Sequence, residues 1–256
     1  MSSERIKEND LIYLVYDNRR RWLVSVSKGK IFHTNRGFIE LDDLINKPFG
    51  SVVFSKPFNT QGYKFYVLKP LPSDYILHMT RKTQIIYPED AGLILLYGNI
   101  SPGSKILEAG CGSGALTCIL GTYIRPNGHV YSFDNRDSSL QRATKNIKKA
   151  DLENYVTIKK ADILNDDLQL REIDTIVLDI SQPWKAIAKV KHYLKFSGIL
   201  VSFSPTIEQI KKTTLELKNN GFYDINTYEL IKRTMQVKEN ATRPQARMIG
   251  HTGYLT

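Results

Sequence analysis

The chain has 256 residues, of which 41% are hydrophobic and 24% charged, a composition typical of a globular protein with one large domain or two smaller ones. It has no run of about 18 apolar residues and begins without an apolar signal core, so we expect no membrane span and a cytoplasmic location. Only two cysteines are present, Cys111 and Cys118, which argues against a disulfide framework and a cysteine zinc site, and we predict no metal site.

The net charge of +10 is concentrated at the two ends of the chain. Residues 1–70 hold 12 Lys and Arg against seven Asp and Glu, and residues 232–256 hold five against one. The long middle segment, 71–231, is nearly balanced, with 19 against 18. This distribution favours a polyanionic partner that is held by the flanks.

The first 70 residues predict a small domain of short β-strands. Six strand-like segments are separated by turns rich in Asn, Asp and Gly, a spacing that suits a small antiparallel β-barrel-like domain. Lys69-Pro70-Leu71-Pro72 then breaks the pattern, so we place the domains at 1–70 and 71–256. The predicted strands are 11–16, 21–26, 30–34, 38–40, 51–54 and 63–68.

From about residue 73, helices and strands alternate, which predicts an α/β fold with a parallel sheet. The last two extended segments, 223–230 and 248–255, have no helix between them, so we expect them to pair antiparallel at the end of this sheet. The predicted helices are 74–79, 88–97, 115–123, 138–150, 184–193 and 206–220, and the predicted strands are 84–87, 105–108, 129–134, 156–160, 175–180 and 198–203.

A glycine-rich loop follows the predicted strand 105–108. Gly110, Gly112 and Gly114 alternate there, and backbone N–H groups can approach a ligand closely because no Cβ stands in the way. The following helix would direct its N-terminus to the same place. The spacing also satisfies the dinucleotide fingerprint, so the loop alone leaves a nicotinamide dehydrogenase open. We assign Ser113, Ala115 and Leu116 to the same cofactor loop.

Two acids next to this loop narrow the choice of cofactor. Asp134 ends the next strand, 20 residues beyond Gly114, where a carboxylate would accept hydrogen bonds from a ribose. NAD and S-adenosylmethionine share that ribose, so Asp134 does not discriminate between them. Glu108 precedes the glycines, and an acid there suits a cationic sulfonium ligand better than a pyrophosphate. We therefore predict S-adenosylmethionine, with Ser139 as a further contact.

The pattern hydrophobic-hydrophobic-Glu-x-Gly-x-Gly-x-Gly resembles motif I of the class I methyltransferases. That resemblance implies their Rossmann-like sheet with an antiparallel terminal strand, which agrees with the pattern of the last two segments. It also implies that Asp162, after the third strand of the sheet, binds the adenine amino group of the cofactor.

Three further motifs resemble one family, the tRNA (adenine-N1)-methyltransferases that modify the T-loop. The strand-end motif Leu-Asp-x-x-x-Pro-Trp is matched at 178–184, Gln-x-x-Tyr-Pro-x-Asp at 84–90, and Gly-His-Thr-x-Tyr-Leu at 250–255. The family also carries a small N-terminal β domain. Two departures stand out: Cys111 replaces a usual threonine, and Ser181-Gln182 replaces the commoner residues before Pro-Trp.

The resemblance implies roles for individual residues. Asp179 would be catalytic, accepting a hydrogen bond from the adenine N6 amine while it also touches the cofactor, and Tyr87 would stack on the adenine or line the methyl pocket. Gln84 would contact the cofactor. We interpret His251 as structural, because no nearby motif supplies an acid–base partner for it.

A base inside the tRNA elbow must be extruded, which requires contacts to the surrounding phosphates. Candidates are Arg19, Arg20 and Arg21 in the first domain, with Arg243 and Arg247 near the C-terminus and, beside them, Lys232, Arg233 and Lys238. The family is homotetrameric, which implies a homotetramer here. The sequence leaves open whether position 58 of tRNA alone, or also position 57, is methylated.

Two other functions stay open at this point. One is a different S-adenosylmethionine enzyme, such as a protein isoaspartyl or small-molecule methyltransferase, against which the basic flanks and the Asp179 motif argue. The other is a non-catalytic tRNA-binding subunit, which the intact Glu108, Asp134, Asp179 and three loop glycines oppose.

Overall fold

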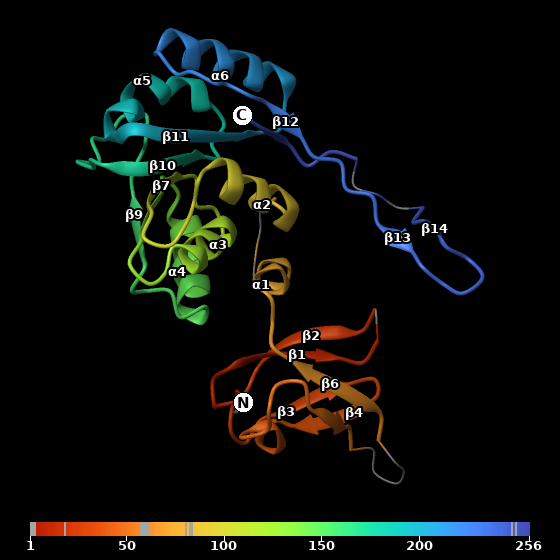
Figure 1. Ribbon diagram of the computed structural model, residues 1–256. Helices are drawn as coiled ribbons and strands as arrows, with labels where there is room; N and C mark the ends of the chain where they lie inside the picture. Colours follow the sequence, from red (N-terminus) through yellow and green to blue (C-terminus); the bar gives the residue numbers. More distant parts are fainter. Residues whose placement is uncertain are drawn as a thin grey trace. The chain divides into compact units, whose positions relative to one another are not determined.

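The computed structural model describes residues 4–17, 19–56, 62–79, 81, 84–246, 248 and 250–256. The chain divides into two compact units, Met1–His78 and Met79–Thr256 (Figure 1). Among the described residues, no helix combines the length and the apolar character needed to cross a membrane.

The first unit consists of small antiparallel sheets around one apolar core. Four strands form a sheet in the order β2-β1-β6-β5, and β3 and β4 form a separate hairpin. Side chains alternate along β6, where Phe65 and Val67 are buried and their neighbours are exposed. All six predicted strands are present, so the N-terminal β domain is confirmed. The elements are β1 (Leu11–Val15), β2 (Arg21–Ser25), β3 (Ile31–Thr34), β4 (Gly37–Glu40), η1 (Leu41–Leu44), β5 (Val52–Phe54), β6 (Lys64–Leu68) and α1 (Pro72–His78).

The second unit is built on a seven-stranded sheet in the order β12-β15-β11-β10-β7-β8-β9. Neighbouring strands from β11 to β9 run parallel, whereas β15 runs antiparallel to both β11 and β12. The predicted Rossmann-like sheet with an antiparallel terminal strand is therefore confirmed. The strands are β7 (Lys105–Ala109), β8 (His129–Asp134), β9 (Val156–Lys160), β10 (Ile173–Leu178), β11 (Leu194–Ser204), β12 (Tyr228–Glu229), β13 (Met235–Gln236), β14 (Arg243–Pro244) and β15 (Tyr254–Leu255).

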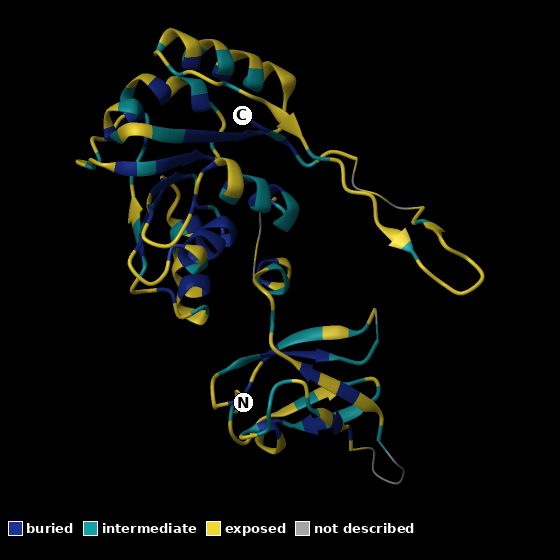
Figure 2. Ribbon diagram, viewed as in Figure 1, coloured by how far each residue is buried: buried dark blue, intermediate teal, exposed yellow. Residues whose placement is uncertain are grey.

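Helices cover both faces of this sheet, which explains why its central strands are apolar on both sides. The group α2, α3 and α4 packs on one face, and α5 and α6 pack together on the other (Figure 1). Residues 115–121 of α3 are all buried (Figure 2). The helices are α2 (Pro88–Tyr97), α3 (Ala115–Tyr123), α4 (Asp137–Lys149), α5 (Ile187–Val190) and α6 (Ile207–Asn219), with the 3-10 turns η2 (Pro183–Lys185) and η3 (Lys191–Tyr193).

Four segments differ from the sequence-based prediction. Residues 84–87, expected to be extended, form no strand and lead directly into α2. The single helix expected over 184–193 is divided into η2, α5 and η3, whose buried residues Pro183, Ile187, Val190 and Tyr193 follow the surface beneath them. The strand expected over 198–203 begins earlier, at Leu194. The two C-terminal segments pair antiparallel as predicted, but only over two residues each. Between them the chain forms the hairpin of β13 and β14, which the sequence pattern did not reveal.

Candidate cofactor and substrate site

The glycine-rich loop leaves the sheet at the end of β7 and leads directly into α3. Gly110, Gly112 and Gly114 all have positive φ, of +93°, +54° and +81°, a conformation that favours glycine. At Gly110 a Cβ atom would lie 2.0 Å from the carbonyl oxygen of Asp179. The loop therefore needs glycine there to pack against the end of β10.

Glu108 lies beneath this loop and is fully buried. Its Oε2 atom accepts hydrogen bonds from Thr117 Oγ1 at 2.6 Å and from Ser132 Oγ at 2.5 Å. Burial raises the pKa of this carboxyl to about 7, although the two hydroxyl donors oppose the rise. In this position Glu108 ties α3 and β8 to the base of the loop.

Asp134, at the end of β8, contacts both the loop and the next turn. It accepts a hydrogen bond from the backbone N–H of Gly112 at 3.1 Å, and Arg136 donates to it from its backbone N–H and its guanidinium at 2.9, 3.1 and 3.3 Å. Burial by itself would raise the pKa of Asp134, but these donors outweigh it and the pKa is lowered. Asp134 is therefore a carboxylate, as a ribose-binding acid needs to be. The sequence analysis missed Arg136, whose side chain lies across that carboxylate.

A cavity of about 320 Å³ opens at the carboxyl ends of β7, β8, β9 and β10. Its volume lies within the range of roughly 300–1,000 Å³ that is usual for small-molecule sites. Four predicted residues, Gly110, Asp134, Asp162 and Asp179, line it. Because the carboxyl ends of parallel strands meet at one edge, residues far apart in the sequence converge here. Its other lining residues are Ala109, Phe133, Asn135, Arg136, Ala161, Ile163, Leu164, Ile180, Ser181 and Gln182.

Asp162 and Asp179 present carboxylates of different character to this cavity. Asp162 caps a turn by accepting hydrogen bonds from the backbone N–H of Leu164 at 2.9 Å and from Asn165 Nδ2 at 2.7 Å. Asp179 is exposed at the cavity, yet the protein atoms gathered around its carboxyl raise its pKa to about 6; Arg136 opposes the rise and Asp134 adds to it. Such an acid is ionised at neutral pH, and its carboxylate can accept hydrogen bonds from a ligand in the cavity.

The remaining predicted cofactor residues lie outside the lining of this cavity. Ser113, Ala115, Leu116 and Ser139 are buried. Ser113 contributes its carbonyl oxygen as the acceptor for Asn146 Nδ2 at 2.8 Å. The hydroxyl of Ser139 is buried and has no hydrogen-bond partner in the described part of the chain.

The upstream motif residues lie just before and at the start of α2. Gln84 is exposed, and Tyr87 is half-buried at the position that precedes the first turn of the helix. Neither residue lines the cavity described above. His251 has an acid partner that sequence reasoning missed, because its Nδ1 lies 2.7 Å from Glu229 Oε1.

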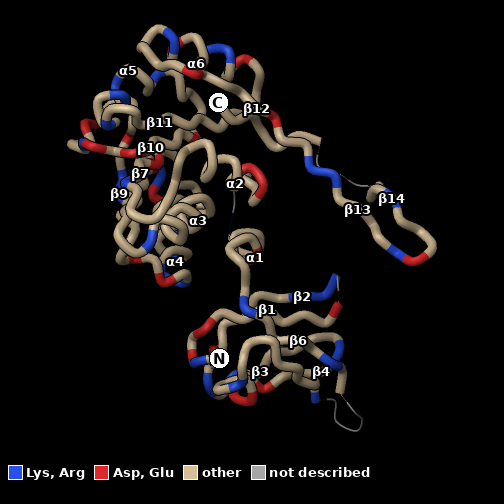
Figure 3. Tube along the Cα trace, in the orientation of Figure 1, with Lys and Arg blue, Asp and Glu red and all other residues tan. Residues whose placement is uncertain are grey.

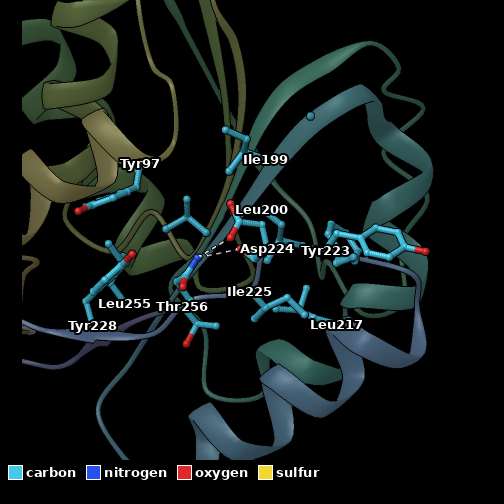
Figure 4. A pocket seen from close by; sticks show the side chains of 14 residues that line it. Tyr97, Ile199, Leu200, Leu217, Tyr223, Asp224, Ile225, Tyr228, Leu255 and Thr256 are labelled. Atoms are coloured by element: carbon cyan, nitrogen blue, oxygen red, sulfur yellow. Dashed lines mark hydrogen bonds between the residues drawn. The ribbon is translucent and has the colours of Figure 1, made fainter.

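A second cavity, of about 240 Å³, lies beside the middle of β11 (Figure 4). Apolar side chains from β11, α6 and the segment after α6 line it, together with the stacked rings of Tyr97 and Tyr228, whose centroids are 4.9 Å apart. None of the predicted cofactor or catalytic residues is among its described lining residues. The cavity at the carboxyl ends of the strands is therefore the better candidate for the cofactor.

The predicted phosphate contacts differ in how far their charges are neutralised. In the first unit, Arg19 and Arg21 are exposed, and the half-buried Arg20 forms an ion pair with Asp17 at 2.5 Å. In the second, Arg243 is exposed on β14, and the cations of that hairpin stand out along its length (Figure 3). Arg247 lies outside the described residues.

Arg36, which sequence reasoning missed, is a further candidate on the first unit. Its guanidinium lies over the rings of Tyr63 and Tyr16, 4.8 and 5.7 Å from their centroids, and donates to the Tyr63 hydroxyl at 3.2 Å. No carboxylate among the described residues pairs with it.

The chain matches two families of known proteins. The family of the tRNA methyltransferase complex GCD14 subunit matches residues 63–243, and the TrmI-like N-terminal family matches residues 6–53. The tRNA (adenine(57)-N(1)/adenine(58)-N(1))-methyltransferase TrmI of Methanocaldococcus jannaschii is 33% identical, over 95% of this chain and 92% of the relative.

Two solved structures are similar over nearly the whole chain. A SAM-dependent O-methyltransferase from Thermotoga maritima is 30% identical with a TM-score of 0.89, covering 98% of this chain and 92% of that one. The tRNA methyltransferase TrmI from Aquifex aeolicus is 26% identical with a TM-score of 0.79, covering 98% and 97%. With the site geometry and the family matches, this identifies the chain as a member of the tRNA (adenine-N1)-methyltransferase family.

Proposed function

We propose that this protein transfers the methyl group of S-adenosylmethionine to N1 of adenine 58 in the T-loop of tRNA, and that adenine 57 is a second target. The observation that carries the proposal is the convergence of Gly110, Asp134, Asp162 and Asp179 on one cavity, in a chain of this family. The inclusion of adenine 57 rests on the archaeal relative, whose name includes both positions.

The residues at the cavity suit this cofactor. Asp134 would accept hydrogen bonds from the ribose hydroxyls of the cofactor. The Arg136 side chain, which donates to the same carboxylate, would then have to share it with the ribose or move away. Asp162 would accept a hydrogen bond from the adenine amine. Gly112 and Gly114 would shape the loop: the backbone N–H of Gly112 donates to Asp134, and Gly114 is packed so closely that a Cβ there would lie 3.1 Å from Cα of Ala143. Glu108 would act from below, holding the loop through Thr117 and Ser132. When bound, S-adenosylmethionine supplies an electrophilic methyl group on a sulfonium cation.

Asp179 would act on the target adenine. Its carboxylate would accept a hydrogen bond from the N6 amine, which pushes electron density towards N1 as N1 attacks the methyl carbon. It would also stabilise the positive charge that the base acquires, an interaction that strengthens in the transition state. No proton has to leave N1, so Asp179 serves as an acceptor and an electrostatic partner. Tyr87, at the start of α2, would stack on the extruded base or line its pocket.

Binding of tRNA would use cations on both units. An adenine inside the folded elbow has to be extruded, and the energy for this comes from contacts to the surrounding phosphates. Arg243 on β14 and Arg19 and Arg21 on the first unit are exposed and suited to this role. Arg36 has the stronger geometry, because its guanidinium is already oriented by two tyrosine rings.

The family resemblance also supports a homotetramer that acts in the cytoplasm on newly made tRNA. The hairpin of β13 and β14 carries exposed apolar side chains that assembly would cover, including Val237 at 77% and Met235 at 49% exposed. Light scattering on the purified protein tests the tetramer, and a monomeric mass at micromolar concentration would refute it.

The proposed activity is tested by mass spectrometry of tRNA treated in vitro with the protein and S-adenosylmethionine. We expect N1-methyladenosine at positions 58 and 57; methylation of position 58 alone would refute the second target. A methyl group on a ribose oxygen would favour the description of the Thermotoga maritima protein instead. Calorimetry with S-adenosylmethionine tests the non-catalytic alternative, which predicts no binding.

A further inference from the structure

His251 joins three separated parts of the second unit. Its Nδ1 lies 2.7 Å from the Glu229 carboxylate at the end of β12, and its Nε2 lies 3.1 Å from the carbonyl oxygen of Pro205, just after β11. Its ring also packs against Tyr254 of β15, with the centroids 4.8 Å apart. Both partners of the ring nitrogens can only accept hydrogen bonds, so the arrangement is satisfied fully when both nitrogens carry a proton.

The charges around His251 favour this doubly protonated form. The hydrogen bond with Glu229 is the largest cause of the raised pKa of His251, and the hydrogen bond with the Pro205 carbonyl is the next. The negative charges of Glu229 and Asp90 also raise this pKa, whereas burial lowers it slightly. Asp90, on α2, is buried with one carboxylate oxygen that has no hydrogen-bond partner among the described residues. Glu89, the neighbour of Asp90 on α2, forms an ion pair with Lys232.

The Pro205 turn connects His251 to the loop that carries the proposed catalytic acid. Thr206 caps α6, where its hydroxyl accepts a hydrogen bond from the backbone N–H of Gln209 at 3.3 Å. The side chain of Gln209 in turn donates to the carbonyl oxygen of Ser181 at 2.9 Å. Ser181 lies two residues after Asp179, so a continuous path of bonded groups runs from His251 to the edge of the cavity.

The same histidine lies at the base of the basic hairpin. We call residues 230–246 the arm; it leaves the sheet after Glu229, contains β13 and β14, and carries the exposed cations Arg233, Lys238 and Arg243 (Figure 3). The chain returns to the sheet at β15, and His251 lies three residues before that strand. The arm is therefore attached on one leg through Glu229 and on the other through His251 itself, with the Lys232–Glu89 ion pair as a second attachment.

We infer that doubly protonated His251 is a positioning residue that fixes the base of the arm against the Pro205 turn, and so holds the arm's cations in register with the catalytic edge of the sheet for tRNA binding. This inference rests on the proposed function. A neutral imidazole can donate only one of the two hydrogen bonds, so the attachment weakens as pH rises through the raised pKa of His251. The effect belongs to tRNA binding and not to the methyl-transfer step.

The test is steady-state kinetics with tRNA from about pH 6 to about pH 9, comparing the full-length wild type with His251→Gln. At the low end, the variant should have a KM for tRNA about threefold to fivefold higher, the upper range for a partly exposed ion pair. The kcat and the affinity for S-adenosylmethionine should not change. As pH increases, the wild-type KM for tRNA should rise towards that of the variant. The KM of the variant should show only the pH dependence that does not come from His251.

Two other variants sharpen the result. Glu229→Gln removes the carboxylate that raises the pKa of His251, so the rise in KM should move to lower pH. His192→Gln, at an exposed histidine on η3, is the matched control and should follow the wild-type profile. Loss of S-adenosylmethionine binding would show that His251→Gln does not fold. In that case the inference is tested by whether the rise in KM moves to lower pH in Glu229→Gln.

The inference is overturned if His251→Gln keeps the wild-type KM and pH profile, or if it still binds S-adenosylmethionine normally but loses kcat as well as tRNA affinity. A wild type that transfers no methyl group to tRNA refutes the proposed function instead. In that case NMR titration of the His251 ring decides its protonation: a midpoint at or below the ordinary value of about 6.5 overturns the doubly protonated form.

Discussion

The α-carbon of Gly110 packs against the carbonyl oxygen of Asp179, so closely that a Cβ atom at position 110 would lie 2.0 Å from that oxygen. The cofactor loop and the proposed catalytic acid are therefore in direct backbone contact. Any side chain at position 110 must displace the end of β10 or the loop.

Gly110→Ala should therefore weaken S-adenosylmethionine binding by more than about tenfold and lower the unfolding temperature, since it adds both a clash and a strained positive φ. Isothermal calorimetry and thermal unfolding measure the two effects. Gly103→Ala is a matched control, because Gly103 has a similar φ of +92° but open space around its Cβ position. Equal losses in the two variants would show that strain alone, and not the Asp179 contact, matters.

Asp179→Asn should lower kcat by about 10²–10³ while S-adenosylmethionine and tRNA still bind, because an amide cannot supply the negative charge that the transition state needs. In the wild type, kcat should rise with pH through about 6, the pKa of Asp179, since only the carboxylate accepts the N6 hydrogen bond. Single-turnover methyl transfer measures both effects. Asp151→Asn, at an exposed turn, is the control. Near-normal turnover in Asp179→Asn would remove Asp179 from the role proposed for it.

Glu108 should make the cofactor-free protein less stable as pH rises. Its pKa in the folded state, about 7, lies above the ordinary value of 4.5, so its contribution to stability is complete below about 4.5 and is lost as pH rises through about 7. A difference of this size corresponds to a free-energy cost on the order of 3 kcal/mol at higher pH. Urea unfolding should give a lower free energy of unfolding for the wild type near pH 8 than near pH 5. The difference between the two pH values should be much smaller for Glu108→Gln. An equal pH dependence in both proteins would contradict the assignment.

Asp134→Asn should weaken S-adenosylmethionine binding by about tenfold or more, the usual cost of losing hydrogen bonds to a charged group. Asp137→Asn is the control, because Asp137 lies three residues further on and forms an ion pair with Lys160 at the surface. Calorimetry gives both affinities. Comparable effects in the two variants would point to a general electrostatic effect rather than to a ribose contact.

Arg36→Gln should weaken tRNA binding and reduce the slope of log affinity against log salt by about one unit, as should Arg243→Gln. Lys56→Gln is the comparison, because Lys56 is already neutralised by Glu40 at 2.8 Å and by Asp43 at 2.9 Å. Filter binding at several salt concentrations measures the slopes. An unchanged slope for Arg36→Gln would exclude contact between its guanidinium and a phosphate.

Much of the fold follows from local sequence patterns. Alternating side chains over segments such as 64–68 and glycine-punctuated turns predict the strands of the first unit, and regular alternation of strands and helices predicts the parallel sheet of the second. The prediction was wrong for 184–193, because periodicity cannot show how a helix has to break to follow the surface beneath it. It also missed the hairpin of β13 and β14, whose two-residue strands lie below the length that gives a pattern.

The sequence by itself determined that glycines and acids lie at the carboxyl ends of successive strands, and in a parallel sheet those ends meet at one edge. The convergence of Gly110, Asp134, Asp162 and Asp179 was therefore predictable. Only the tertiary structure decided that Glu108 turns into the core, that Arg136 lies across Asp134, and that His251 pairs with Glu229. These contacts depend on distances between side chains that are brought together by packing, and sequence spacing carries no information about such distances.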